Sequence, residues 1–142
     1  MKSKFYLITS LLLLVILTGC TQKIIDLSDI PDIHGSEGVV LTPKKAEIKK
    51  DDTLAVTVDW THHTNSPVSF NETDIIPFAE QDKEELVWEK DTSTDLDTKV
   101  QAGETKSVTL MFPLENKHDH VAISMIQHGH LITDSNFTIK FK

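Results

Sequence analysis

The chain has 142 residues, with 22 acidic residues against 14 lysines and no arginine, and its net charge is −8. A chain of this length forms one domain with room for a leader. Because arginine's planar guanidinium is the usual group for gripping phosphates, and because an acidic chain repels polyanions, the composition argues against a nucleic-acid partner.

The first 19 residues have the three parts of a secretory signal: Lys2 and Lys4, an apolar run from Phe5 to Leu17, and small residues at the cleavage point. The apolar run is shorter than the about 20 residues of a membrane-spanning helix. Leu17-Thr18-Gly19-Cys20 resembles the bacterial lipoprotein signal, in which the cysteine is lipidated and becomes the first mature residue. The resemblance implies cleavage between Gly19 and Cys20 and attachment to the outer face of the cell membrane.

Two other interpretations of this segment remain open, a retained single-span anchor and a cleaved signal with a stray cysteine. Lipidation would use Cys20, the only cysteine, so no disulfide can form and the fold depends on its core alone. Loss of residues 1–19 would remove Lys2 and Lys4. The 123-residue mature chain would then carry twelve lysines against 22 acidic residues, a net charge of −10.

Residues 20–38 are expected to form the lipidated N-terminus and a flexible tether. The segment is polar and acidic, contains Pro31, Gly35 and Gly38, and sustains no helical or strand period. Such a tether would reach at most about 60 Å at ~3.3 Å per residue. The alternative is partial docking of its apolar side chains, Ile24, Ile25 and Ile30, on the domain.

Residues 39–142 are expected to form an all-β domain. Apolar residues alternate with polar ones in four segments, so that every second side chain lines one face of a strand. These segments are 54–60, 108–112, 121–125 and 137–141, and weaker candidates lie at 46–49, 68–70, 75–78 and 86–88. The best helical stretch, Glu80 to Glu89, is short and equally suits a turn before a strand. Seven or more short strands predict a β-sandwich of immunoglobulin size, with Trp60 in its core and Trp88 half-buried.

Four short stretches resemble an uncharacterised family of immunoglobulin-like domains in surface lipoproteins of Gram-positive bacteria. They are Trp60 to Pro67, Gln81 to Leu86, the turn Ala102-Gly103-Glu104-Thr105, and Phe112 to Asn116. Lys83 replaces the family's usual glycine and Ala102 its usual proline. The resemblance implies a fold and a location at the cell envelope, and it brings no catalytic residues.

Seven histidines are the unusual chemical resource of the chain. In immunoglobulin order, the loop with His62 and His63 and the loop with His128 and His130 emerge at the same end of the sandwich. Imidazole is a common ligand of zinc and copper, so these four residues are the candidate transition-metal site. The alternative is that they are solvated loop histidines. His118 and His120 are expected at the opposite end, near Asp51 and Asp52.

The sequence offers no nucleophile motif, phosphate-binding glycine loop or recognisable cleft for paired carboxylates, so we expect no enzyme. The expected function is non-catalytic binding or scaffolding by a membrane-anchored β-sandwich. Its partner would be an envelope protein, a peptide or a wall component. The alternatives are metal binding through the histidine loops and an immunity-type lipoprotein that intercepts a cationic peptide or toxin.

Overall fold

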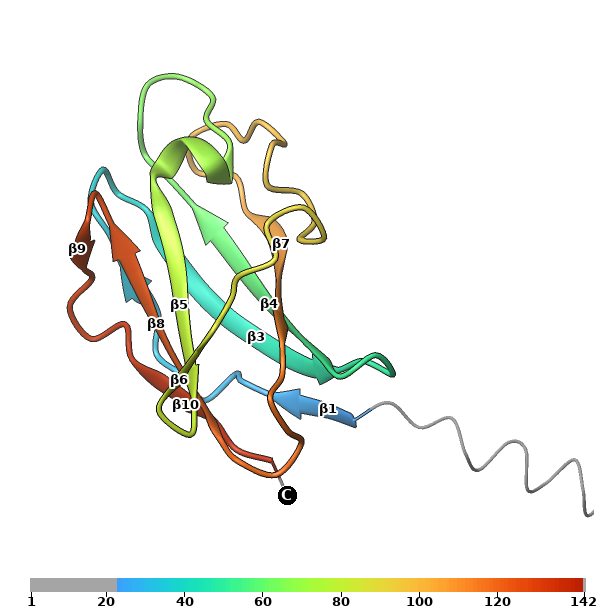
Figure 1. The fold of residues 1–142 in the computed structure, drawn as a ribbon. Helices are drawn as coiled ribbons and strands as arrows, with labels where there is room; N and C mark the ends of the chain where they lie inside the picture. The colour runs from blue at the N-terminus through green and yellow to red at the C-terminus, as the bar shows by residue number, and fades with distance from the viewer. Residues whose placement is uncertain (1–22, 142) are drawn as a thin grey trace, which may run out of the picture.

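Two antiparallel β-sheets, packed face to face, make up residues 23–141, the part of the chain that this computed structural model describes (Figure 1). The fold is a β-sandwich, and its only helical element among these residues is the 3₁₀ turn η1 (Phe70–Thr73). The prediction of an all-β domain is confirmed. No helix in residues 23–141 is long and apolar enough to span a bilayer. The signal segment and Cys20 lie outside the described part.

The first sheet has the strand order β1-β3-β4-β7, with β2 also paired to β3. Its strands are β1 (Lys23–Asp26), β2 (Ile33–His34), β3 (Val40–Ile48), β4 (Thr53–Thr61) and β7 (Lys106–Pro113). The expected strands at 54–60 and 108–112 are β4 and β7, which pair from Thr53 opposite Pro113 to Trp60 opposite Lys106. Their alternation puts Val56, Val58 and Leu110 in the core.

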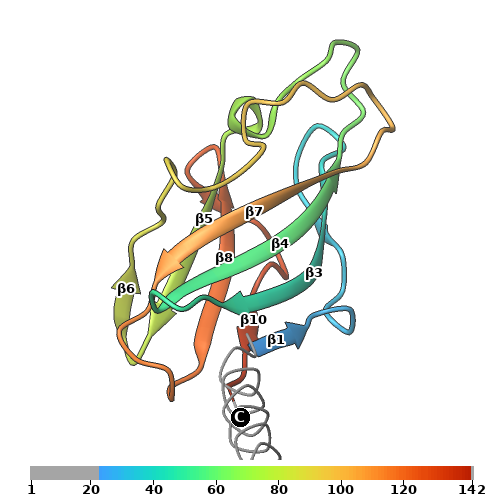
Figure 2. The same ribbon diagram turned by 90° about the vertical axis from the view of Figure 1, so that its right-hand side faces the viewer.

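The second sheet has the strand order β10-β8-β5-β6, with β9 also paired to β8. Its strands are β5 (Ile75–Gln81), β6 (Glu84–Leu86), β8 (Val121–Gln127), β9 (His130–Leu131) and β10 (Phe137–Ile139). The stretch Glu80 to Glu89 is therefore no helix, because Gln81 pairs with Glu84 across a two-residue hairpin turn. Figure 2 shows the two sheets as separate layers.

The space between the sheets is filled by one cluster of apolar side chains contributed by both. Trp60 is buried there, as its place in the alternation predicts, and its ring meets Phe70 edge-on at a centroid distance of 5.7 Å. Trp88 is half-buried against the cluster, and its indole N–H donates to Ser93 Oγ at 3.0 Å. Both tryptophan predictions are confirmed.

The prediction of a flexible tether is wrong for residues 23–38. β1 pairs with β3 from Lys23 opposite Ile48 to Asp26 opposite Lys45, and β2 pairs with the start of the same strand. Leu27 and Ile33 are buried in the common core, and Ile25 and Ile30 pack against it. The alternative of docked apolar residues is confirmed for Ile25 and Ile30. The folded domain therefore includes residues from Lys23 onward.

Two prolines lie where their missing N–H breaks no strand pairing. Pro43 falls in the gap on β3 between the residues paired with β2 and those paired with β1, at a register shift. Pro77 lies on the part of β5 that precedes its pairing with β6. A proline cannot donate to a sheet and is confined to edges and bulges. Pro43 therefore lies at the break between the β1 and β2 pairings, where β3 needs no N–H donor.

Candidate functional site

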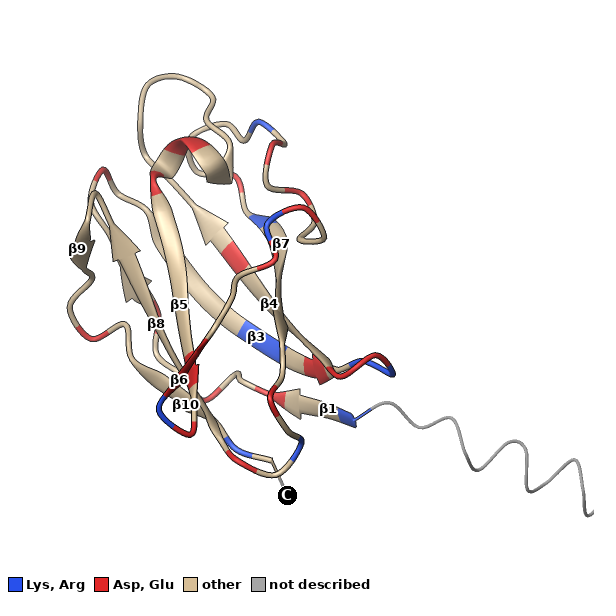
Figure 3. Ribbon diagram, in the orientation of Figure 1, with Lys and Arg blue, Asp and Glu red and all other residues tan. Residues whose placement is uncertain are grey.

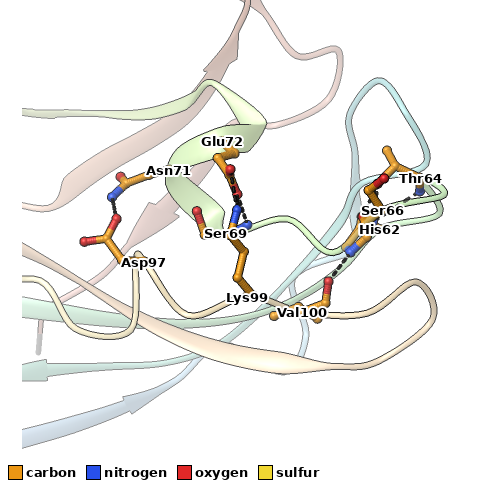
Figure 4. Close-up of polar contacts among 9 residues, drawn as sticks. All are labelled: His62, Thr64, Ser66, Ser69, Asn71, Glu72, Asp97, Lys99 and Val100. Carbon is orange, nitrogen blue, oxygen red and sulfur yellow. Dashed lines mark hydrogen bonds and ion pairs between the residues drawn. The ribbon is translucent and has the colours of Figure 1, made fainter.

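Two loops from distant parts of the chain meet at one end of the sandwich, and we call residues 62–74 and 95–105 the loop platform. The first runs from the end of β4 through η1 to the start of β5, and the second leads into β7. In Figure 1 both lie at the top, beyond the ends of β4, β5 and β7. Figure 4 shows the polar contacts that join them.

His62 joins the two loops on the side of the platform that faces the core. Its imidazole is fully buried, and Nε2 lies 2.6 Å from the carbonyl oxygen of Val100, to which it donates. Nδ1 accepts the backbone N–H of Thr64 at 3.2 Å. The ring also stacks on Trp60 at a centroid distance of 5.8 Å. His62 is therefore a structural residue with both ring nitrogens occupied.

Backbone hydrogen bonds extend the connection between the loops. Val68 and Val100 exchange two bonds of 3.1 and 2.8 Å, and the N–H of Asn71 donates to the carbonyl of Leu96 at 3.0 Å. The N–H of Gly103 donates to the carbonyl of His62 at 2.9 Å, at a position where φ is +81°. Glycine is the residue that adopts this conformation without strain. The loops are therefore held as one unit.

Two polar pairs lie on the outside of the platform. Lys99 Nζ bonds both carboxylate oxygens of Glu72, with 2.5 Å to Oε2, and the Ser69 N–H donates to Oε2 at 2.6 Å. The lysine and then this backbone bond lower the pKa of Glu72 to about 2. The second pair is Asn71 Nδ2 donating to Asp97 Oδ1 at 2.5 Å. Both pairs join η1 to the second loop.

An open groove of about 620 Å³ lies at the edge of the platform, between η1 and the 90–98 segment, and most of its lining residues belong to the platform. It is lined by Asn71, Lys90, Asp91, Ser93, Asp95, Leu96, Asp97 and Thr98. The three carboxylates in this lining are exposed, and Lys90 Nζ lies 5.6 Å from the centre of the Trp88 ring. The carboxylates outnumber the one lysine of the lining, so the groove favours a positively charged group.

The four histidines of the candidate metal site do not form one. Both ring nitrogens of His62 are occupied, and His128 Nδ1 lies 3.1 Å from Asp74 Oδ2. His63 and His130 are exposed. In residues 23–141 no group of three or more histidine, cysteine, aspartate or glutamate side chains is placed to hold a metal ion. The predicted metal site is wrong because His62 follows the alternation of β4, so its side chain points into the core and not towards the other histidines.

His118 and His120 lie at the other end of the sandwich, in the β7–β8 loop, as expected. Lys117 of that loop pairs with Asp52 of the β3–β4 turn at 2.6 Å, which places the two turns together. The ring of His120 accepts the N–H of Phe141 at 3.3 Å. These histidines and those of the platform are therefore separated by the length of the strands.

Sequence reasoning missed the groove because its walls come from η1 and from a segment about twenty residues later. Asp95 and Asp97 are exposed and stand in a polar stretch of the sequence, which is typical of a solvated loop. Their proximity to Asn71 depends on the bonds between Val68 and Val100, which no local pattern reveals. No protein-family model matches the chain, and no curated protein matches it in sequence.

Proposed function

We propose that the chain is an extracytoplasmic lipoprotein, anchored at Cys20, whose β-sandwich binds a cationic partner at the loop platform without catalysing a reaction. The single observation that carries the proposal is the groove between η1 and residues 90–98, with three exposed carboxylates and one lysine. The partner class follows from this charge and from the excess of 22 acidic residues over 14 lysines in the whole chain.

The strand order supports assigning the sandwich to the immunoglobulin-like class. β3, β4 and β7 have the arrangement of strands A, B and E, and β10, β8, β5 and β6 that of strands G, F, C and C′. In that class the loops at one end of the sandwich are common binding surfaces. The platform comprises the B–C loop and the segment before strand E. β1 and β2 are then additions to the outer edge of strand A.

The hydrogen bonds that hold the platform together support a role in binding a partner. Hydrogen bonds from His62, Asn71 and Lys99 fix both loops to each other before any partner arrives. A preformed surface loses less conformational entropy on binding than a mobile one. The acidic groove would therefore present its carboxylates in a defined geometry.

The start of β1 at Lys23 limits how far the domain stands from the membrane. Only Thr21 and Gln22 separate Cys20 from that strand. Three residue steps span at most about 10 Å at ~3.3–3.6 Å each. Under the proposal, the domain lies against the membrane surface, and its partner is one that comes to that surface.

The test uses the intact protein in its own cells. Cys20→Ser should release the chain from the membrane fraction and abolish incorporation of labelled fatty acid. Cross-linking in intact cells should capture a cationic partner with the wild type and lose it with Asp91→Asn/Asp95→Asn. The charge-matched control is Asp29→Asn/Asp82→Asn, which changes two exposed carboxylates outside the groove. Equal capture by both double variants would refute the platform as the binding site.

A further inference from the structure

A row of apolar side chains crosses the outer face of the second sheet. Ile76 of β5 pairs with Ile126 of β8, which in turn pairs with Leu131 of β9. Ile76 is 49% and Leu131 58% exposed, and Ile126 is half-exposed between them. Phe78, two residues along β5, points to the same face and is also half-exposed. Neighbouring cross-strand side chains are about 5 Å apart, so the four make one continuous patch.

The patch continues into a shallow groove of about 330 Å³ on the same face. Phe78 belongs to both, and the groove adds the polar side chains Glu80, Ser124, Asn136 and Thr138. An apolar strip with polar groups beside it is the arrangement expected of a surface that binds an amphipathic segment. Single exposed apolar residues need no explanation, but contiguous ones indicate a binding surface.

The charged residues on the strands of this sheet are all acidic. Its five strands contain three glutamates, at positions 80, 84 and 85, and no lysine, whereas those of the first sheet contain four lysines and three acidic residues. Figure 3 shows acidic residues on β5 and β6, and blue segments on β1, β3 and β7. A cationic segment meets no repulsion from the strands of this face. An anionic one meets no attraction.

The patch is also continuous with the loop platform. η1 leads through Asp74 directly into β5, two residues before Ile76. Asp74 is exposed and contacts His128 at the end of β8. A bound segment long enough to cover the patch would therefore pass beside acidic groups of the platform at one end and beside Glu80 at the other.

We infer that the outer face of β5, β8 and β9 is a docking surface for a cationic amphipathic peptide, its apolar side on Ile76, Phe78, Ile126 and Leu131. This inference rests on the proposed function and names the chemistry of the partner. Burial of apolar area supplies the affinity, and the glutamates and platform carboxylates select positive charge. A domain whose first strand begins within about 10 Å of the lipid anchor stays close to the bilayer, and such peptides gather there because they partition into membrane surfaces.

The experiment uses the full lipidated chain in phosphatidylcholine nanodiscs, with empty nanodiscs as the reference. The probe is a fluorescein-labelled 18-residue helix of leucine and lysine, followed by fluorescence anisotropy. Ile76→Thr/Leu131→Thr should raise its Kd at least tenfold, because threonine keeps the strand but removes the apolar contact. The matched control is Ile24→Thr/Val87→Thr, two residues that are 61% and 67% exposed elsewhere, and it should leave the Kd within twofold.

A glutamate version of the probe should not bind. Amide hydrogen exchange gives an independent map, with slower exchange in β8 and β9 when the lysine probe is bound. Absence of binding to the wild type, or equal weakening by the two double variants, overturns the docking surface. If Asp91→Asn/Asp95→Asn weakens binding while the Ile76/Leu131 variant does not, the docking surface is wrong and the platform proposal stands. If only the Ile76/Leu131 variant weakens it, the docking surface stands and the platform is not the site for this peptide.

Discussion

Gln81 and Gln127 are the last residues of β5 and β8, the two central strands of the second sheet, and each lies opposite the first residue of the other strand. Gln81 is the last residue of β5 and pairs with Val121, the first of β8, while Gln127 is the last of β8 and pairs with Ile75, the first of β5. Both amides are buried. Each one binds backbone that leaves the sheet, so the two glutamines fix loops at opposite ends of the sandwich.

Removing the Gln81 amide should destabilise the domain. Nε2 donates to the carbonyls of Asn116 and Asp119 at 2.9 and 2.8 Å, and Oε1 accepts the N–H groups of Glu115 and Asn116 at 2.9 and 3.1 Å. Gln81→Leu leaves these loop groups without partners, at a cost of about 1–3 kcal/mol. Urea unfolding measures the loss. Gln101→Leu at an exposed site is the control and should change stability by less than about 0.5 kcal/mol.

Gln127 connects the turn after β2 to the end of η1. Its Oε1 accepts the N–H of Ser36 at 2.7 Å, and its Nε2 donates to the carbonyl of Thr73 at 3.0 Å. A Cβ placed on Gly35 would lie 2.5 Å from that Oε1, so Gly35→Ala should displace the amide and cost about 1–3 kcal/mol. In a Gln127→Ala background the same change should cost clearly less. Additive losses in the double variant would contradict this contact.

The sequence is sufficient to predict the strands in which apolar and polar residues alternate over many positions. It is insufficient to predict the short strands whose order depends on pairing with a distant strand. β4, β7 and β8 each carry at least three inward apolar side chains at alternate positions, which local periodicity reveals. β1 and β2 are short, and Ile24 faces solvent. Their order comes from pairing with β3 and from the buried side chains of Leu27 and Ile33. No pattern within residues 20–38 encodes those distant contacts.

Replacing the His62 ring with an apolar ring of similar size tests its structural role. His62→Phe keeps the stack on Trp60 but removes the bond to the Val100 carbonyl, which still accepts the Val68 N–H, and leaves the Thr64 N–H unpaired, so we expect a loss of about 1–3 kcal/mol. Exchange of the Gly103 amide should accelerate as the platform loosens. His130→Phe, at an exposed position, is the control. Micromolar zinc should not raise the melting temperature of the wild type, and a rise lost in the His62 variant would restore the metal hypothesis.

The β5–β6 turn offers a stabilising substitution. Asp82 and Lys83 have φ of 50° and 66°, and a two-residue hairpin with positive φ at both positions favours glycine at the second. Lys83→Gly should raise the free energy of unfolding by about 0.5–1 kcal/mol, since relief of strain exceeds the added freedom of the unfolded chain. Ala102→Gly, where φ is not positive, should lower it. Thermal unfolding of both variants measures these changes. A lower stability of Lys83→Gly would show that the substitution relieves no strain.

Glu72 should make the platform sensitive to acid. Lys99 and the Ser69 N–H lower its pKa from 4.5 to about 2 in the folded chain. A lowered folded pKa stabilises the domain above the ordinary pKa, and this contribution is lost as pH falls from about 4.5 towards 2. Because the pair is exposed to solvent, salt should reduce the effect.

The comparison of wild type with Glu72→Gln isolates this carboxylate, because the amide keeps the shape but does not titrate. The stability difference between the two proteins should be constant above pH 5 and should shrink below it, as measured by urea unfolding at a series of pH values. Lys99 keeps its charge throughout this range, so the change belongs to Glu72. Glu104→Gln, at an exposed acidic residue of the same platform, is the matched control. An identical pH profile for both variants would show that the contact with Lys99 does not lower the pKa of Glu72.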